Sequence, residues 1–194
     1  MKRALTGALV VAVLLVAGCD RQDQGPVRVT AIGEKPKLVD PSTGPLDNPE
    51  SILVQNAAQG LVRFDAQGNI VPGLAERWNV SDDGLSYIFR LQSGEWPSGR
   101  EITAQDVARL LRRQLAAQSR NSLKDAVGAV AEVVAMTDRV IEIRLSAPRS
   151  HLLQLLAQPE FGLVRNGEGA GPFQIKSSDE DSVQLARILP GPEG

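Results

Sequence analysis

Short alternating runs of apolar and polar residues, separated by tight turns, constrain the fold of this 194-residue chain most strongly. The clearest run is residues 85–91, in which every second side chain is large and apolar. Period two predicts a strand with one apolar face: Leu85, Tyr87, Phe89 and Leu91. The turn residues 81–84 separate this run from a partner at 76–80, which indicates a β-hairpin. A turn this short can join two neighbouring strands only if the strands are antiparallel.

Similar runs recur along the chain. Hairpins are predicted for 61–64 with 70–72, for 130–136 with 139–145, and within 169–188. The β-branched stretch at 27–32 and the run at 161–164 indicate single strands.

Helical signals lie between these hairpins. Thr103 is a good N-cap, and Val107, Leu110, Leu111 and Leu115 follow it at helical spacing. Shorter helices are expected over 51–59 and 151–157. The sum is an α+β fold of antiparallel hairpins with two or three helices.

Residues 1–18 have the three parts of an export signal. Lys2 and Arg3 give a positive start, and an uninterrupted apolar run follows at 8–16. Ala17 and Gly18 provide the small residues of a cleavage site. The apolar run is shorter than the about 20 residues that span a bilayer, so a transmembrane helix is not expected.

Cys19 is the only cysteine, and residues 16–19 (Val-Ala-Gly-Cys) resemble the bacterial lipobox. The resemblance implies cleavage before Cys19 and lipidation of its sulfur, with 19–26 as a polar tether. A lipid with two or more acyl chains is a stable anchor. Asp20 resembles a signal for retention at the inner membrane, on its periplasmic side. The alternatives are a chance cysteine and a reactive thiol, but no neighbouring His or Lys would activate the thiol.

Composition excludes several classes of function. The chain has 21 basic and 23 acidic residues and no basic run, so nucleic acid is not an expected partner. One histidine, His151, and one cysteine argue against a transition-metal site. No pairing of nucleophile and base at a known spacing is present. We therefore expect neither an enzyme nor a cofactor-binding protein.

Several motifs in order resemble the family 5 extracellular solute-binding proteins of ABC importers, the oligopeptide-, dipeptide- and nickel-type binding proteins. They are LVDP (38–41), GLVRFDAQGNIVPGLAERWNVSDDGLSYIFRLQSG (60–94), ITAQDV (102–107), RVIEIRLSAP (139–148) and GAGPF (169–173). The resemblance implies a type II periplasmic-binding-protein fold. In this fold two lobes close by a hinge on a solute, most often a peptide, and deliver it to membrane permease subunits.

The resemblance also implies an incomplete clamp. Family members are much longer, and here the chain ends soon after GAGPF. The interpretation is that 27–194 is a partial solute-binding domain, the first lobe with the extra N-terminal domain, and that the second lobe is absent. One half of a binding cleft cannot enclose a solute, so weak peptide binding is expected. The alternative is a membrane-tethered interaction or sensor module that keeps the fold without capturing solute.

Four residues are candidates for ligand contact. In the family the loop after LVDP approaches the ligand, which places Leu46, Asp47 and Asn48 nearest the cleft. Asp47 would meet a ligand amine, or would remain a solvated loop carboxylate. Trp96, in a loop with Pro and Gly, is a candidate pocket floor, whereas Trp78 beside a hairpin is expected in the core. The acidic residues 179–181 are interpreted as a solvated hairpin tip rather than a calcium site.

Overall fold

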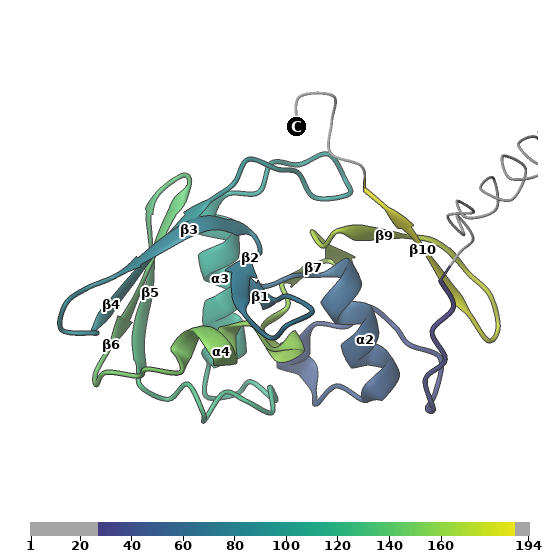
Figure 1. Cartoon of the computed structure of the whole chain (residues 1–194), viewed down its shortest axis with the longest axis horizontal. Helices are drawn as coiled ribbons and strands as arrows, with labels where there is room; N and C mark the ends of the chain where they lie inside the picture. The colour runs from purple at the N-terminus through teal and green to yellow at the C-terminus, as the bar shows by residue number, and fades with distance from the viewer. Residues whose placement is uncertain (1–26, 189–194) are drawn as a thin grey trace, which may run out of the picture. The chain divides into compact units, whose positions relative to one another are not determined.

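A four-stranded antiparallel sheet is the largest element of this computed structural model, which describes residues 27–188. Its order is β3 (Ala75–Val80), β4 (Ser86–Leu91), β6 (Val140–Leu145) and β5 (Val130–Thr137) (Figure 1). The hairpins predicted for β3 with β4 and for β5 with β6 are confirmed. Pairing of β4 with β6 joins the two hairpins into one sheet.

One face of the sheet is buried under the helix α3 (Ala104–Leu115). Tyr87, Phe89 and Leu91 point into this core, as the alternation predicted, and Phe89 and Leu91 are fully buried. The helix contributes Val107, Leu110 and Leu111. Its expected cap is present, because the Thr103 hydroxyl accepts a hydrogen bond from the Asp106 backbone N–H at 3.2 Å.

The opposite face of the sheet is polar and charged. Arg90 pairs with Glu76 at 2.9 Å, and Arg144 bonds both Glu132 and Glu142. The Arg144 guanidinium, helped by the Ser86 hydroxyl, lowers the pKa of Glu142. This network is typical of a solvated sheet face, so the sheet buries one face only.

The turns are held by their own side chains. The Asp83 carboxylate accepts hydrogen bonds from the Ser81 hydroxyl at 2.6 Å and the Leu85 N–H at 2.9 Å, which lowers its pKa. Gly84 adopts the left-handed conformation with φ of 67°. Local chemistry of this kind is why the hairpin could be predicted from its four turn residues.

The remaining elements are short helices and two-stranded pairs. The helices are η1 (Pro41–Thr43), α2 (Asn48–Ala57), α4 (Leu152–Leu156) and η2 (Pro159–Phe161). The strand pairs are β1 (Val62–Phe64) with β2 (Ile70–Pro72), β7 (Val164–Arg165) with β8 (Glu168–Gly169), and β9 (Phe173–Ser178) with β10 (Val183–Arg187). None of the helices within residues 27–188 has the length and hydropathy needed to cross a bilayer.

Three of the predicted elements differ in the structure. No strand forms over 27–32, because no described segment pairs with its backbone, and Val27 and Ile32 are left about nine-tenths exposed. Of the strand expected over 161–164, only Val164 belongs to a strand, because Phe161 ends the helical turn η2. The helix α2 begins at Asn48, three residues earlier than predicted, because Asp47 caps it.

Candidate functional site

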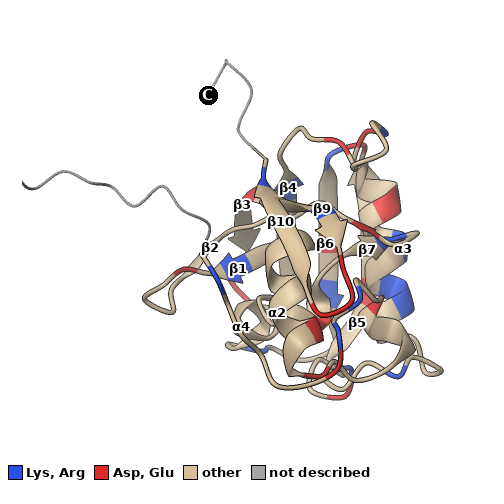
Figure 2. Ribbon diagram, turned by 90° about the vertical axis from the view of Figure 1, so that its right-hand side faces the viewer, with Lys and Arg blue, Asp and Glu red and all other residues tan. Residues whose placement is uncertain are grey.

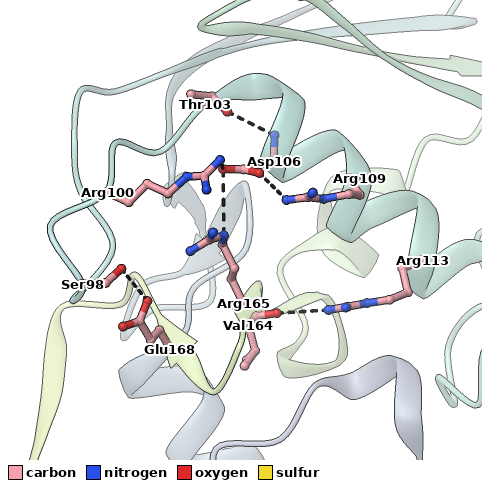
Figure 3. Close-up of polar contacts among 9 residues, drawn as sticks. All are labelled: Ser98, Arg100, Thr103, Asp106, Arg109, Arg113, Val164, Arg165 and Glu168. Carbon is pink, nitrogen blue, oxygen red and sulfur yellow. Dashed lines mark hydrogen bonds and ion pairs between the residues drawn. The ribbon is translucent and has the colours of Figure 1, made fainter.

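Asp106 is a buried carboxylate surrounded by arginines from three parts of the chain. It lies in the first turn of α3, and only 6% of its side chain is exposed. Arg109 bonds it from the next turn, and Arg100 approaches from the preceding loop at 3.5 Å. Arg165 of β7 approaches to 4.0 Å (Figure 3). One carboxylate therefore holds α3, the loop before it and β7 together.

Arg165 also covers Trp96. Its guanidinium carbon lies 5.9 Å from the centre of the indole ring, within range of a cation–π interaction. The tryptophan is 1% exposed and belongs to the main core. The predicted pocket floor is therefore closed over in this structure, and a role for Trp96 in ligand contact stays a prediction.

A groove lies beside this cluster. It has a volume of about 180 Å³ and is lined by Leu38, Ala57, Pro97, Gly167, Glu168, Gly169, Phe173, Gln174 and Ile175. Its charged residue is Glu168 on β8, whose carboxylate accepts a hydrogen bond from the Ser98 hydroxyl at 2.9 Å. The groove combines apolar surface with one carboxylate, Glu168, and one side-chain amide, Gln174.

The Gly-Ala-Gly-Pro motif begins at Gly169 in the groove lining and packs closely against the end of α2. A Cβ atom on Gly169 would lie 2.3 Å from the Ala57 carbonyl oxygen, and one on Gly171 would lie 2.5 Å from the Asn56 carbonyl oxygen. The Gly171 N–H also donates to the Ala57 carbonyl at 2.9 Å. The motif thus closes the C-terminal end of α2, whose last carbonyls need external partners.

The predicted ligand loop has a structural role at the other end of α2. The Asp47 carboxylate accepts the Glu50 N–H at 2.8 Å, and Glu50 accepts the Asp47 N–H in return, which is a capping box. Leu46 packs against a small cluster around Val54. Asn48 is exposed in the first turn. Ligand contact by Leu46, Asp47 and Asn48 stays a prediction.

Other residues weighed from the sequence lie away from the groove lining. Trp78 is partly buried against the core, and His151 is exposed at the start of α4. Residues 179–181 are exposed at the tip between β9 and β10 (Figure 2), and no group of three or more metal-binding side chains occurs among the described residues. Cys19, the predicted lipidation site, lies outside the described residues.

The sequence did not predict which residues the structure brings together at this site. Ser98 and Glu168 are 70 positions apart, and no motif links them. The arginine partners of Asp106 were not predicted either. The available signal was its position in the first turn of an amphipathic helix, which cannot specify partners from distant strands.

Comparison with known proteins adds to this geometry. Residues 69–187 match the family described as bacterial extracellular solute-binding proteins, family 5 Middle. The dipeptide-binding protein DppE of Bacillus subtilis is 27% identical over 189 residues, which cover 79% of this chain and 34% of that protein. The probable deoxycholate-binding periplasmic protein YgiS of Escherichia coli is 30% identical over 131 residues, covering 58% of this chain and 24% of that protein.

A solved structure shows the same fold. The Haemophilus influenzae OppA complex with the peptide RPPGFSPFR superposes with a TM-score of 0.71 at 20% identity, covering 80% of this chain and 37% of that one. The chain thus spans about a quarter to a third of the length of the curated relatives described above. The predicted α+β fold of a type II binding protein is confirmed for this part.

Proposed function

This chain belongs to the family 5 bacterial extracellular solute-binding proteins, and from that premise we propose that it is the lipid-anchored solute-binding component of an ABC importer for peptides. The family match over 69–187 is the observation that carries the proposal. The family is one of binding proteins and not of enzymes. Similarity to proteins named for dipeptide and oligopeptide binding supports peptides as the solute class.

The geometry of the groove is compatible with this function. A carboxylate among apolar and glycine residues can meet one end of a peptide. A volume of about 180 Å³ is smaller than the roughly 300 Å³ or more of sites that enclose a drug-sized ligand. The groove would therefore receive part of a solute, and the remaining contacts would come from elsewhere in the assembled binding site.

The proposed partners follow from the same premise. A permease in the inner membrane would receive the solute, and a lipid on Cys19 would hold the protein on the periplasmic side of that membrane. The short tether at 19–26 would keep the binding domain within roughly 25 Å of the anchor, because an extended chain spans about 3.3 Å per residue. That distance favours repeated encounters with a permease in the same membrane.

Peptide uptake tests the function. Deletion of the gene is expected to reduce uptake of radiolabelled di- and tripeptides by cells, because solute would no longer be delivered to the permease. Re-expression of the full chain should restore uptake, and uptake of a labelled sugar serves as the control. Unchanged peptide uptake in the deletion strain would contradict the proposal and favour a tethered module without solute capture.

Metabolic labelling tests the anchor. Radiolabelled palmitate is expected to enter the wild-type protein, and Cys19→Ser should abolish labelling because the serine hydroxyl does not replace the thiol. The Cys19→Ser protein should also leave the membrane fraction. A matched control is Ser51→Ala, which lies far from the signal and should label like wild type. A wild-type protein that stays unlabelled and soluble would refute the anchoring proposal.

A further inference from the structure

Four exposed arginines lie together on the solvent side of α3 and in the loop before it, and blue segments mark them along α3 in Figure 2. We call them the arginine face, which consists of Arg100, Arg109, Arg112 and Arg113. The apolar residues of α3 lie in the core, and its exposed residues are Gln105 and three of these arginines. The helix therefore presents a polar and basic surface to solvent.

Positive charge is in excess on this surface. One carboxylate, Asp106, is the counter-ion of three arginines, which are Arg100, Arg109 and Arg165. A single negative charge cannot balance three positive charges. Arg165 is largely buried behind the surface, so the uncompensated charge is carried outward by Arg100 and Arg109, whose side chains are more than half exposed.

Arg112 adds a charge that no carboxylate balances. It makes no ion pair within residues 27–188, and its Nε donates a hydrogen bond to the Ala108 carbonyl at 3.2 Å. The two terminal nitrogens of its guanidinium make no hydrogen bond to the described residues. Arg113, in contrast, pairs with Asp40. Arg112 is therefore held through one donor while its other donors remain available to a ligand.

The surface is hollowed where these side chains meet. A shallow depression of about 360 Å³ is lined by Gln105, Asp106, Arg109 and Arg112. Residues 105, 109 and 112 share one side of the helix because they are four and three positions apart. A further carboxylate, Asp138, touches this surface and accepts a hydrogen bond from the Gln105 amide at 3.2 Å. Every residue of the lining is polar or charged, so the depression does not suit an apolar group.

Phosphate is the acceptor that this surface fits. A guanidinium forms charge-assisted, often bidentate hydrogen bonds with phosphate oxygens. Because an α-helix rises about 1.5 Å per residue, Arg109, Arg112 and Arg113 lie well within the Debye length of about 10 Å at 0.1 M salt, so their charges act together. Several cations spread along one helix face match an array of phosphates better than one small ion.

We propose that the arginine face docks on the phosphate groups of an anionic phospholipid membrane. The inference rests on the proposed lipid anchor, because the tether at 19–26 would hold the domain within reach of the lipid headgroups. The whole chain has a net charge of −2, so an anionic surface repels most of the molecule and attracts this face. Docking would therefore orient the anchored domain, with α3 toward the bilayer.

Co-sedimentation with vesicles tests the docking on the full chain carrying Cys19→Ser, so that no attached lipid contributes. The vesicles contain either phosphatidylcholine alone or equal parts of phosphatidylcholine and phosphatidylglycerol. We expect stronger binding to the anionic vesicles, and this binding should fall as salt is raised. Arg112→Gln should weaken it about fivefold, and Arg109→Gln together with Arg112→Gln about 30-fold, from the usual contribution of an arginine near an anionic surface.

Arg77→Gln is the matched control. Arg77 is also exposed and makes no ion pair among the described residues. It lies opposite Arg90 in the β3–β4 pair, on the sheet face turned away from α3. This variant removes the same charge and should bind vesicles like the parent chain. Arg112→Lys keeps the charge and should retain most of the binding.

Three results would overturn the inference. The first is binding that does not depend on phosphatidylglycerol, and the second is equal binding of the Arg112→Gln and Arg77→Gln chains. The third is displacement from the vesicles by inorganic phosphate at constant ionic strength, which would indicate a site for a single phosphate ion. The measurement needs neither peptide nor lipidation, so its failure is distinct from a failure of peptide uptake or of palmitate labelling.

Discussion

Asp106→Ala is expected to lower the free energy of unfolding by about 3–5 kcal/mol. The substitution removes the carboxylate that Arg100, Arg109 and Arg165 share. Arg100 and Arg109 can turn to solvent, since more than half of each side chain is exposed. Arg165 cannot, because its side chain is 14% exposed, so its charge would stay buried without a counter-ion.

Urea denaturation of wild type and variant measures this effect. Asp82→Ala is the control, because Asp82 is an exposed turn residue and should change stability by less than about 0.5 kcal/mol. Adding Arg165→Met to Asp106→Ala should recover part of the loss by removing the buried charge itself. Equal stability of the Asp106 and Asp82 variants would show that the arginine cluster does not hold these segments together.

Gly169→Val is expected to destabilise the protein by about 3 kcal/mol or more. Its Cβ would meet the Ala57 carbonyl oxygen at 2.3 Å and the Ala58 Cβ at 2.5 Å. Neither atom is the flexible end of a long side chain. The steric clash can therefore be relieved only if the motif moves away from the end of α2. That movement would also disturb the hydrogen bond from the Gly171 N–H to the Ala57 carbonyl.

Gly44→Ala is the matched control for this prediction. No atom would lie within 4 Å of its added Cβ, and its φ of 176° is extended backbone that alanine adopts freely. Its change in unfolding free energy should stay within about 0.5 kcal/mol. Thermal or urea unfolding compares the two variants, and a Gly169→Val protein as stable as Gly44→Ala would mean that the motif does not pack tightly on α2.

The parts predicted correctly depend on contacts between near neighbours in sequence. Asp83 and Gly84 shape their own turn, and Thr103 bonds an amide three residues away. The alternation around Phe89 identifies the buried face before the opposing helix is known. These features follow from backbone geometry and local hydrogen bonding, so a short stretch of sequence is sufficient to predict them.

Some predictions differed because the state of a segment depends on distant partners, and others because a local signal was overlooked. The stretch 27–32 has strand-forming residues, yet a strand needs another backbone to pair with. The start of α2 was predicted three residues too late, although Glu50, three residues after Asp47, already indicated a capping box. The burial of Trp96 also depends on distant residues, because the core and Arg165, which follows 69 positions later, enclose it.

By itself the sequence determined the hairpins, the cap of α3, the resemblance to a solute-binding family and the expectation of a lipid anchor. Only the tertiary structure decided that Arg165 is directed to Asp106 and that Glu168 is positioned by Ser98 at a groove. The physical reason is how far apart in the sequence the interacting residues lie. Turns and caps are stabilised within a few residues, whereas the charge balance of a site depends on which distant side chains packing brings within hydrogen-bonding distance.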